Sequence, residues 1–380
     1  MSISTFGDVF PSRLRACQLA VLLLALGLAV SAAAQGTNGV IAGTIADSQG
    51  GVLPGVSVTV RNTDTGATRT ETTEVDGRYR FAALPSGRYE LKAELQGFTT
   101  SNVTGLTLTI NLELRQDVTM ALGGVQESLT VTGQSPVVET TKSEVGAVIN
   151  REQIAMLPAA NRQAVLLALL LPGTSQDGTR PRRNNAQVGA GTLQFTSNHL
   201  VDGTMNMSIK AGEPREDFPQ SAILEFKVLT SQAPAEYGGR AGGVVSVVTK
   251  GGTNLFSGEA YEYFRNKDFG RVDQFKQAEI DRTGQPKPQF ERHQFGGALG
   301  GPVVKDRLHF FIAAEDTSDK TSYNITTTHP ELYGKFEGNF RNESPNRLFF
   351  VRGDAQINPQ QNAFVRWGYQ DRKSVCRERV

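Results

Sequence analysis

The chain has 380 residues, 40 of them glycine, and a formal net charge of +1. This length allows two or three domains, and the many glycines favour β-structure with frequent turns over a helical bundle. Lysine and arginine form no one-sided run of the kind that phosphate binding needs, which excludes nucleic acid as a partner.

The first 34 residues have the order of a secretory signal peptide. Arg13 and Arg15 precede an apolar run at residues 19–30, and small residues follow it. We expect cleavage between Ala34 and Gln35. The alternative is a membrane anchor, but a run of about twelve residues covers only about 18 Å of a hydrocarbon core about 30 Å thick.

Residues 37–122 alternate between apolar and polar positions in short segments separated by turn signals. Seven such strands in about 85 residues predict a small β-sandwich. The alternation through Leu106, Leu108, Ile110 and Leu112 predicts one continuous strand. The aromatic residues of this region alternate like core residues, so we expect burial rather than an exposed sugar-binding platform for Tyr79, Phe81, Tyr89 and Phe98.

Three ordered pieces of this region carry a family resemblance: VLPGVSVTV, DGRYRF and LPSGRYELKAELQGF. Together they resemble the carboxypeptidase regulatory-like domain, which has a carbohydrate-binding-like fold. Such domains lack a catalytic site, and no histidine occurs between Gln35 and Leu122. A metallocarboxypeptidase is therefore excluded.

Residues 125–132, VQESLTVT, resemble the TonB box of outer-membrane receptors. The resemblance implies that a periplasmic TonB-type energy-coupling protein would take this segment as an added strand. The residues expected to couple are Glu127, Ser128, Leu129, Thr130, Val131 and Thr132. The alternative is an ordinary strand or linker.

Residues 136–254 have a mixed pattern that predicts a compact α+β domain. Asn161 can cap a core helix over the apolar run 164–171, which Pro172 and Gly173 end. Strand-like pieces follow at 193–195, 199–201, 223–229 and 244–249. The pieces LPAANRQ, LVDGT, AILEFKVLT and AEYGGRAGG occur in the order of the plug domain of Oar-like TonB-dependent receptors. For Asp202 and Glu236 we expect a turn cap and a hydrogen-bond acceptor in the plug wall, respectively, rather than catalysis.

After residue 255 the hydrophobic period becomes two, as in membrane β-barrels. Leu308 and Ile312 fall on the face expected to point outward, and His309 and Glu315 fall on the other. Polar stretches at 266–291 and 317–335 are expected to be outer loops. A soluble sandwich is the alternative. A receptor barrel needs about 22 strands, and residues 255–370 hold about five, so we expect the chain to be a fragment.

Residues 371–380, DRKSVCRERV, break the alternation and are rich in charge. Read back into codons, their first four residues resemble a common sequencing adapter, so we predict adapter read-through; the alternative is a genuine charged terminus. The two cysteines are Cys17 and Cys376. The segment 35–370 therefore has no cysteine for a disulfide or a thiolate metal site.

These patterns predict a mainly β protein with an N-terminal β-sandwich, a small α+β plug and the first strands of an incomplete transmembrane β-barrel. The resemblance implies an Oar-like TonB-dependent receptor in the outer membrane of a Gram-negative bacterium, with its N-terminal domain in the periplasm. Such a receptor would contact outer-membrane lipid and take up an unidentified substrate, such as a carbohydrate or a peptide. The alternative is a secreted or surface adhesion protein that binds carbohydrate.

Catalytic patterns are missing from the sequence. Its four histidines are isolated from one another, and no zinc motif, nucleophile elbow or nucleotide-binding loop occurs. We therefore expect no enzyme activity, no cofactor and no metal.

Overall fold

The computed structural model describes residues 37–123, 128–132, 144–156, 162, 164–176, 186–189, 196–208, 214–238, 242–270, 274–284, 287, 289–325, 327, 329–336, 338–372 and 375–376. The predicted signal peptide, with Ala34 and Gln35, lies outside these residues, and so do Glu127, Asn161 and the predicted strand at 193–195. The described chain is mainly β, which confirms the predicted fold class.

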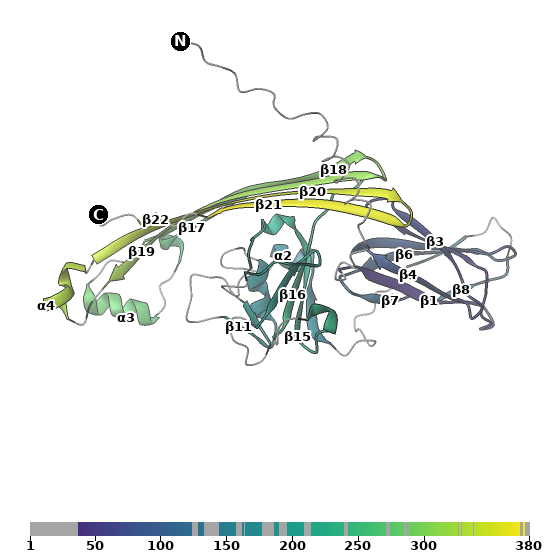
Figure 1. Cartoon of the computed structure of the whole chain (residues 1–380), viewed down its shortest axis with the longest axis horizontal. Helices are drawn as coiled ribbons and strands as arrows, with labels where there is room; N and C mark the ends of the chain where they lie inside the picture. The colour runs from purple at the N-terminus through teal and green to yellow at the C-terminus, as the bar shows by residue number, and fades with distance from the viewer. Residues whose placement is uncertain are drawn as a thin grey trace, which may run out of the picture. The chain divides into compact units, whose positions relative to one another are not determined.

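Two sheets form the N-terminal region, as Figure 1 shows. In the first sheet the order is β4 (Arg78–Leu84), β1 (Gly39–Asp47) and β7 (Glu113–Arg115), and β8 (Val118–Met120) also pairs with β1. In the second sheet the order is β3 (Thr68–Thr72), β2 (Ser57–Asn62), β5 (Gly87–Glu94), β6 (Thr100–Leu108) and β9 (Ser128–Thr132). The sequence pattern missed β3, because its residues TRTET are polar and largely exposed on both faces.

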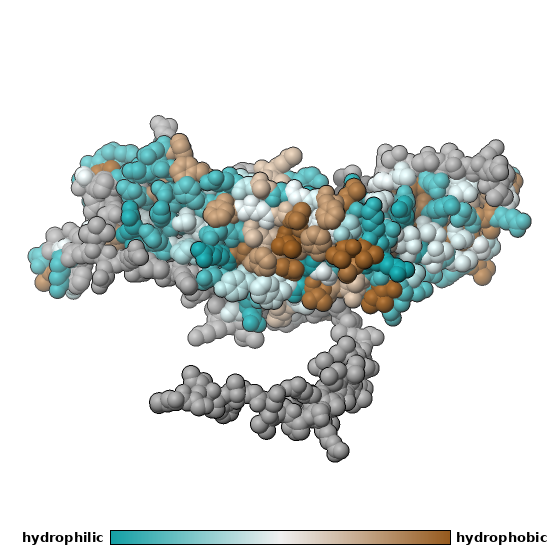
Figure 2. Space-filling view, turned by 90° about the horizontal axis from the view of Figure 1, so that it is seen from above, coloured by the Kyte–Doolittle hydropathy of each residue, from teal (hydrophilic) through white to brown (hydrophobic). Residues whose placement is uncertain are grey.

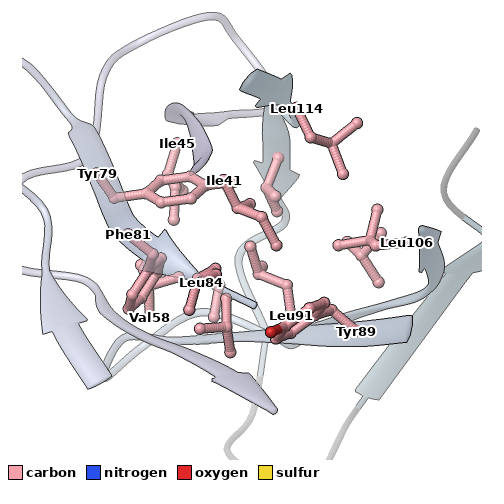
Figure 3. Close-up of a cluster of buried hydrophobic side chains, with 14 of the residues drawn as sticks. Ile41, Ile45, Val58, Tyr79, Phe81, Leu84, Tyr89, Leu91, Leu106 and Leu114 are labelled. Carbon is pink, nitrogen blue, oxygen red and sulfur yellow. The ribbon is translucent and has the colours of Figure 1, made fainter. Parts of the chain in front are cut away.

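The inner faces of these two sheets share one hydrophobic core (Figure 3). Tyr79, Phe81 and Tyr89 are at most 4% exposed, and Phe98 packs against the same core, so their predicted burial is confirmed. The hydroxyl groups of Tyr79 and Tyr89 donate to backbone carbonyls at 2.5 and 2.7 Å, which satisfies their polar ends inside the core. Burial raises the pKa of Tyr89 to about 12.

One predicted strand is interrupted. The alternation through Leu106–Leu112 continues in the sequence, but β6 ends at Leu108, and Leu112 donates its backbone N–H to the Thr109 carbonyl in a turn. Asn111 in this turn has a φ of +55°, which asparagine tolerates better than most residues. The turn takes Ile110 out of the sandwich core.

The plug region folds around a five-stranded sheet. Its order is β10 (Val145–Ile149), β15 (Ile223–Ser231), β16 (Val244–Thr249), β13 (Asn198–Val201) and β14 (Thr204–Met205). A short hairpin of β11 (Thr174–Gln176) and β12 (Ala186–Val188) accompanies it, together with α2 (Arg151–Met156), η1 (Ala164–Leu170), η2 (Gln220–Ala222) and η3 (Ala235–Tyr237). The helix expected at 164–171 is thus a 3₁₀ helix. Its buried residues Leu167 and Ala168 join the core that includes Phe226 and Val245.

The capping of α2 was not foreseen from the sequence. The Gln153 N–H donates to the Asn150 side-chain oxygen, and the Asn150 N–H donates to the Gln153 side-chain oxygen, each at 3.0 Å. This reciprocal pair is a capping box, which satisfies two backbone donors at the start of the helix. No helix in the described residues combines the length and the apolar composition needed to span a membrane.

Long antiparallel strands make up the C-terminal region (Figure 1). They are β17 (Ser257–Asn266), β18 (Phe290–Val304), β19 (Leu308–Ile325), β20 (Gly338–Asn358) and β21 (Gln361–Arg372), and each pairs with the next; β22 (Val375–Cys376) also pairs with β20. The segment between β17 and β18 contains η4 (Lys267–Phe269) and α3 (Gln274–Thr283), and α4 (Pro330–Tyr333) and η5 (Gly334–Phe336) lie between β19 and β20. The described strands form an open sheet rather than a closed barrel.

The prediction of an outer loop over 317–335 is wrong for its first half, because β19 continues to Ile325. This part of the strand is polar, so it lacks the apolar alternation on which the prediction rested. Cross-strand charge pairs stabilise it instead. Arg292 and Asp319 are opposite each other and form an ion pair, and the Glu291–Lys320 pair beside them is 3.0 Å apart.

The two faces of the long strands differ as predicted. Leu308 and Ile312 are more than a third exposed, whereas His309, Phe311 and Glu315 are at most 7% exposed. In β21, Val365, Trp367 and Tyr369 lie on the exposed face. Figure 2 shows apolar residues gathered in the middle of the viewed face, with hydrophilic residues toward its two ends. A sheet with one apolar exposed face suits contact with lipid.

Candidate functional site

The tip of the β13–β14 hairpin lies where the plug region contacts the long strands. Val201 pairs with Thr204, so Asp202 and Gly203 are the two central residues of the turn. Their φ angles are +46° and +77°. Two positive φ angles are typical of a type I′ turn, for which Asp-Gly is a favoured pair. The prediction that Asp202 lies in a turn is confirmed.

The carboxylate of Asp202 is buried, with 3% of its side chain exposed, and hydrogen-bonded within the plug. It accepts from the backbone N–H of Thr249 at 2.9 Å and from the Thr249 hydroxyl at 2.8 Å. Thr249 is the last residue of β16, so these bonds join the hairpin tip to the end of the neighbouring strand. A carboxylate with these donors is oriented in one position.

Two arginines of the long strands face this carboxylate. Arg352 on β20 approaches Asp202 to 3.5 Å, and Arg366 on β21 approaches it to 3.3 Å. The two arginines are also opposite each other across β20 and β21. Like charges in opposite positions repel, so the carboxylate between them stabilises the pair. The sequence pattern alone identifies no partner for either arginine.

Further hydrogen bonds fix both guanidinium groups. Arg352 donates to the Thr249 carbonyl at 3.0 Å and pairs with Asp354 at 2.8 Å. Arg366 donates to the Val201 carbonyl at 3.0 Å and to the Thr204 hydroxyl at 2.6 Å. The arginine side chains are only 14% and 20% exposed, so solvent screens these contacts less than a surface ion pair. We call Asp202, Thr249, Arg352 and Arg366 the anchor.

An apolar contact lies on the same face of the long strands. Phe311, Ala313 and Phe350 form a buried cluster with Ala222 of the plug, and Phe218 packs edge-on against Phe350 with ring centroids 5.6 Å apart. The sequence predicted charged residues on this inner face. Phe311 and Phe350 are apolar residues on the same face, and the plug, rather than water, covers them.

Glycines allow the chain to pass closely along the strands where the plug ends. A Cβ on Gly252 would lie 2.4 Å from the carbonyl oxygen of Phe310, and a Cβ on Gly251 would lie 2.6 Å from an Asp354 carboxylate oxygen. Side chains at these two positions would push the segment away from β19 and β20. These close approaches supply a steric reason for glycine at both positions.

The sandwich also contacts the plug, through the turn that follows β6. Ile110 is 1% exposed, and its N–H donates to the Glu225 carboxylate on β15 at 2.6 Å. The Asn111 side-chain amide donates to the Tyr237 hydroxyl. Burial raises the pKa of Glu225, although the hydrogen bond from the Ile110 N–H opposes the shift. Glu236, by contrast, is exposed, and its role as a hydrogen-bond acceptor in the plug wall stays a prediction.

The predicted coupling residues Ser128, Leu129, Thr130, Val131 and Thr132 form β9. Their backbone pairs in parallel with β6 of the sandwich, from Thr100–Ser128 to Thr104–Thr132. Sequence reasoning missed this pairing. A parallel pair has no tight turn between its strands, so no local turn signal could have indicated it.

The hydrogen bonds and ion pairs of the anchor are suited to holding the plug against the long strands rather than to catalysis. Asp202 already accepts two hydrogen bonds and faces two cations, so its carboxylate is occupied by donors. Within the part of the chain that the structure describes, no three histidine, cysteine or acidic side chains gather into a set that could hold a metal ion. The arrangement can connect the plug to the long strands and can be broken only by separating buried charges.

Two family models match the chain. Residues 40–121 match the carboxypeptidase regulatory-like domain, and residues 248–347 match an outer membrane beta barrel domain. The TonB-dependent transporter Oar of Myxococcus xanthus is 26% identical over 328 residues, which cover 84% of this chain and 30% of Oar. The chain is homologous to TonB-dependent receptors. The outer membrane of a Gram-negative bacterium is therefore its location.

A second relative of this chain is the probable TonB-dependent siderophore receptor PirA of Acinetobacter baumannii. It is 30% identical over 203 residues, which cover 48% of this chain and 24% of PirA. The crystal structure of PirA from A. baumannii matches with a TM-score of 0.43 and 22% identity, covering 60% of this chain and 32% of that chain. The chain thus spans about a third or less of the length of these relatives, which are named as transporters and receptors rather than enzymes.

Proposed function

We propose that the chain carries the sandwich, the plug and the first barrel strands of a TonB-dependent receptor that takes up a substrate across the outer membrane. A barrel wide enough for nutrients must be closed at rest, and the outer membrane has no ATP to open it. Energy then has to arrive from a periplasmic partner, which would act on residues 127–132.

The observation that carries this proposal is the anchor. A plug that opens on demand needs a contact that holds at rest and that can re-form in one position. The buried Asp202 between Arg352 and Arg366 has these properties, because each guanidinium also binds a defined carbonyl of the plug. Hydrogen bonds between charged groups are directional, so the plug returns to the same position against the long strands.

The competing function, carbohydrate binding by an adhesion protein, lacks support in the sandwich. Sugar platforms use exposed aromatic faces, whereas Tyr79, Phe81 and Tyr89 are buried in the core. Their rings cannot stack on a sugar without unfolding the domain.

The test uses the full-length gene product, extracted from outer membranes, and the purified periplasmic domain of the TonB-type protein from the same bacterium. Binding by strand addition depends on backbone N–H groups more than on side chains. Leu129→Pro removes one N–H, whereas Leu129→Ala keeps it. We expect Leu129→Pro to weaken capture by the immobilised domain at least tenfold and Leu129→Ala to leave it within threefold. Equal capture of both variants would show that this segment is not the coupling strand. Heat-modifiable migration in gels confirms that each variant is folded.

A further inference from the structure

The coupling segment is an ordered part of the sandwich. β9 is the last strand of the sheet β3-β2-β5-β6-β9, and in the described part of the chain β6 is the one strand with which it pairs. Residues along a strand direct their backbone N–H and C=O groups alternately to its two sides. One side of β9 therefore faces β6, and the other side forms the edge of the sheet.

The length of the pairing matches a structural limit in β6. β9 pairs with residues 100–104, and the next residue, Gly105, has a φ of +81°. The register between β5 and β6 shifts at the same place, between the pairs Tyr89–Leu106 and Leu91–Val103. Such a bulge ends the regular ladder. The straight part of β6 thus provides a platform of five residues, the length of β9.

A short tether keeps the segment near this platform. The Thr99 N–H donates to the Ala121 carbonyl at 2.8 Å, and the Gly123 N–H donates to the Gly97 carbonyl at 3.3 Å. Only four residues, 124–127, separate Gly123 from the start of β9. Four residues can reach at most about 14 Å when fully extended. The effective concentration of β9 at the β6 edge is therefore on the order of millimolar.

We propose that the sandwich is a presentation platform: β6 holds residues 128–132 as an ordered strand, and the periplasmic partner adds its own strand to the outer edge of β9 without displacing it. This inference rests on the proposed function. A free peptide must be ordered when it binds, and that ordering weakens its affinity. A strand already held by β6 has been ordered in advance, and in the described part of the chain no strand pairs with its outer edge.

When the sandwich presents β9, a pulling force on β9 also reaches the plug by a second route. A load on β9 reaches the plug through the chain itself and, in addition, through the sandwich. The second route runs from β6 to Ile110, which is hydrogen-bonded to Glu225, and to Asn111, which is hydrogen-bonded to Tyr237. Glu225 lies on β15, the strand between β10 and β16 in the plug sheet. The sandwich therefore passes force to the sheet that carries the anchor residue Thr249.

A disulfide between β6 and β9 tests the inference. Asn102 and Thr130 are register partners, and the Cα atoms of neighbouring strands lie about 5 Å apart, within the range that a disulfide spans. The variant carries Asn102→Cys and Thr130→Cys in the full-length protein. The matched control, Thr59→Cys with Thr70→Cys, staples β2 to β3 in the same sheet without touching β9. The probe is the periplasmic domain of the TonB-type protein, and its Kd is measured by fluorescence anisotropy with and without reductant.

We expect the oxidised Asn102→Cys/Thr130→Cys protein to bind the domain within threefold of the reduced form, or more tightly, and the control to be unchanged. A loss of tenfold or more on oxidation, reversed by reductant and not seen in the control, would overturn the inference and show that β6 competes with the partner. Leu129→Pro separates the two claims: if it binds as tightly as wild type, the proposed coupling role fails regardless of the disulfide result.

Discussion

The substitution Asp202→Asn removes the charge of the anchor while keeping its shape. The amide oxygen can still accept the Thr249 N–H, but the amide NH₂ group then faces donors where the carboxylate accepted them. Arg352 keeps its ion pair with Asp354, and Arg366 keeps the Val201 carbonyl and the Thr204 hydroxyl. The two guanidinium groups opposite each other lose the anion between them.

The expected cost follows from burial. Hydrogen bonds to charged groups contribute about 1.5–3 kcal/mol each, and breaking a buried ion pair by removing one partner costs about 3–5 kcal/mol. Both arginines keep other partners and remain 14% and 20% exposed, so we expect a loss near the lower limit, about 3 kcal/mol. This loss corresponds to an opening constant on the order of 100-fold larger.

Hydrogen exchange of the Thr249 amide measures this opening directly, because that N–H donates to the Asp202 carboxylate. In full-length protein in detergent, Asp202→Asn should accelerate exchange of this amide on the order of 100-fold. Asp217→Asn is the matched control, because Asp217 also contacts a long strand but accepts from the neutral side chain of Gln370 at 3.4 Å. An exchange rate in Asp202→Asn within threefold of wild type would refute the reasoning that the anchor holds the plug.

Three further predictions test the contacts around the anchor and the sandwich. Phe350→Ala should lower the free energy of plug opening, measured by protection from added protease, by about 3–5 kcal/mol, because its ring is fully buried against the plug. Phe349→Ala, on the exposed face, should change this free energy by less than about 1 kcal/mol. Equal effects of the two substitutions would contradict the assigned faces. Gly252→Ala should reduce the yield of heat-modifiable protein, because its Cβ would lie 2.4 Å from the Phe310 carbonyl oxygen. Gly353→Ala is the control, because a Cβ there meets open space and should not reduce the yield. A normal yield for both variants would contradict the close approach of Gly252 to β19. Because the pKa of Glu225 is raised in the folded state, the folded state binds more protons than the unfolded state. Protection of the Ile110 amide from hydrogen exchange, corrected for intrinsic exchange, should therefore fall as pH rises from about 4.5 through the raised pKa. Glu225→Gln should flatten this pH dependence, and a wild-type profile in the variant would contradict the assigned role of Glu225.

The periodic parts of the fold were predictable from the sequence. A period of two assigns residues to faces without any knowledge of partners, and it placed Ile312 outward and Glu315 inward correctly. The core aromatics of the sandwich followed from the same rule. It failed for β3 and for the polar half of β19, because strands held by backbone pairing and cross-strand charges carry no apolar alternation.

The contacts that make up the candidate site could not be predicted in the same way. Asp202 and Arg352 are 150 positions apart, and either residue alone is an ordinary charged side chain. The burial of Phe350 depends on its contact with the plug, which the local sequence pattern does not show. The pairing of β9 with β6 depends on a parallel arrangement without a turn signature. Local patterns identify strands and faces, whereas partners depend on how distant segments meet.

The most direct test of the account is whether energised coupling through residues 128–132 loosens the plug. Ala222 is fully buried in the cluster with Phe311 and Phe350, so a cysteine there becomes reactive only when the plug separates from the long strands. The measurement is the rate of maleimide labelling of Ala222→Cys in living cells that express the full-length protein. We predict faster labelling in energised cells than in cells treated with a protonophore, and no difference in the Leu129→Pro background. Equal rates with and without energy in the otherwise wild-type protein would contradict the account.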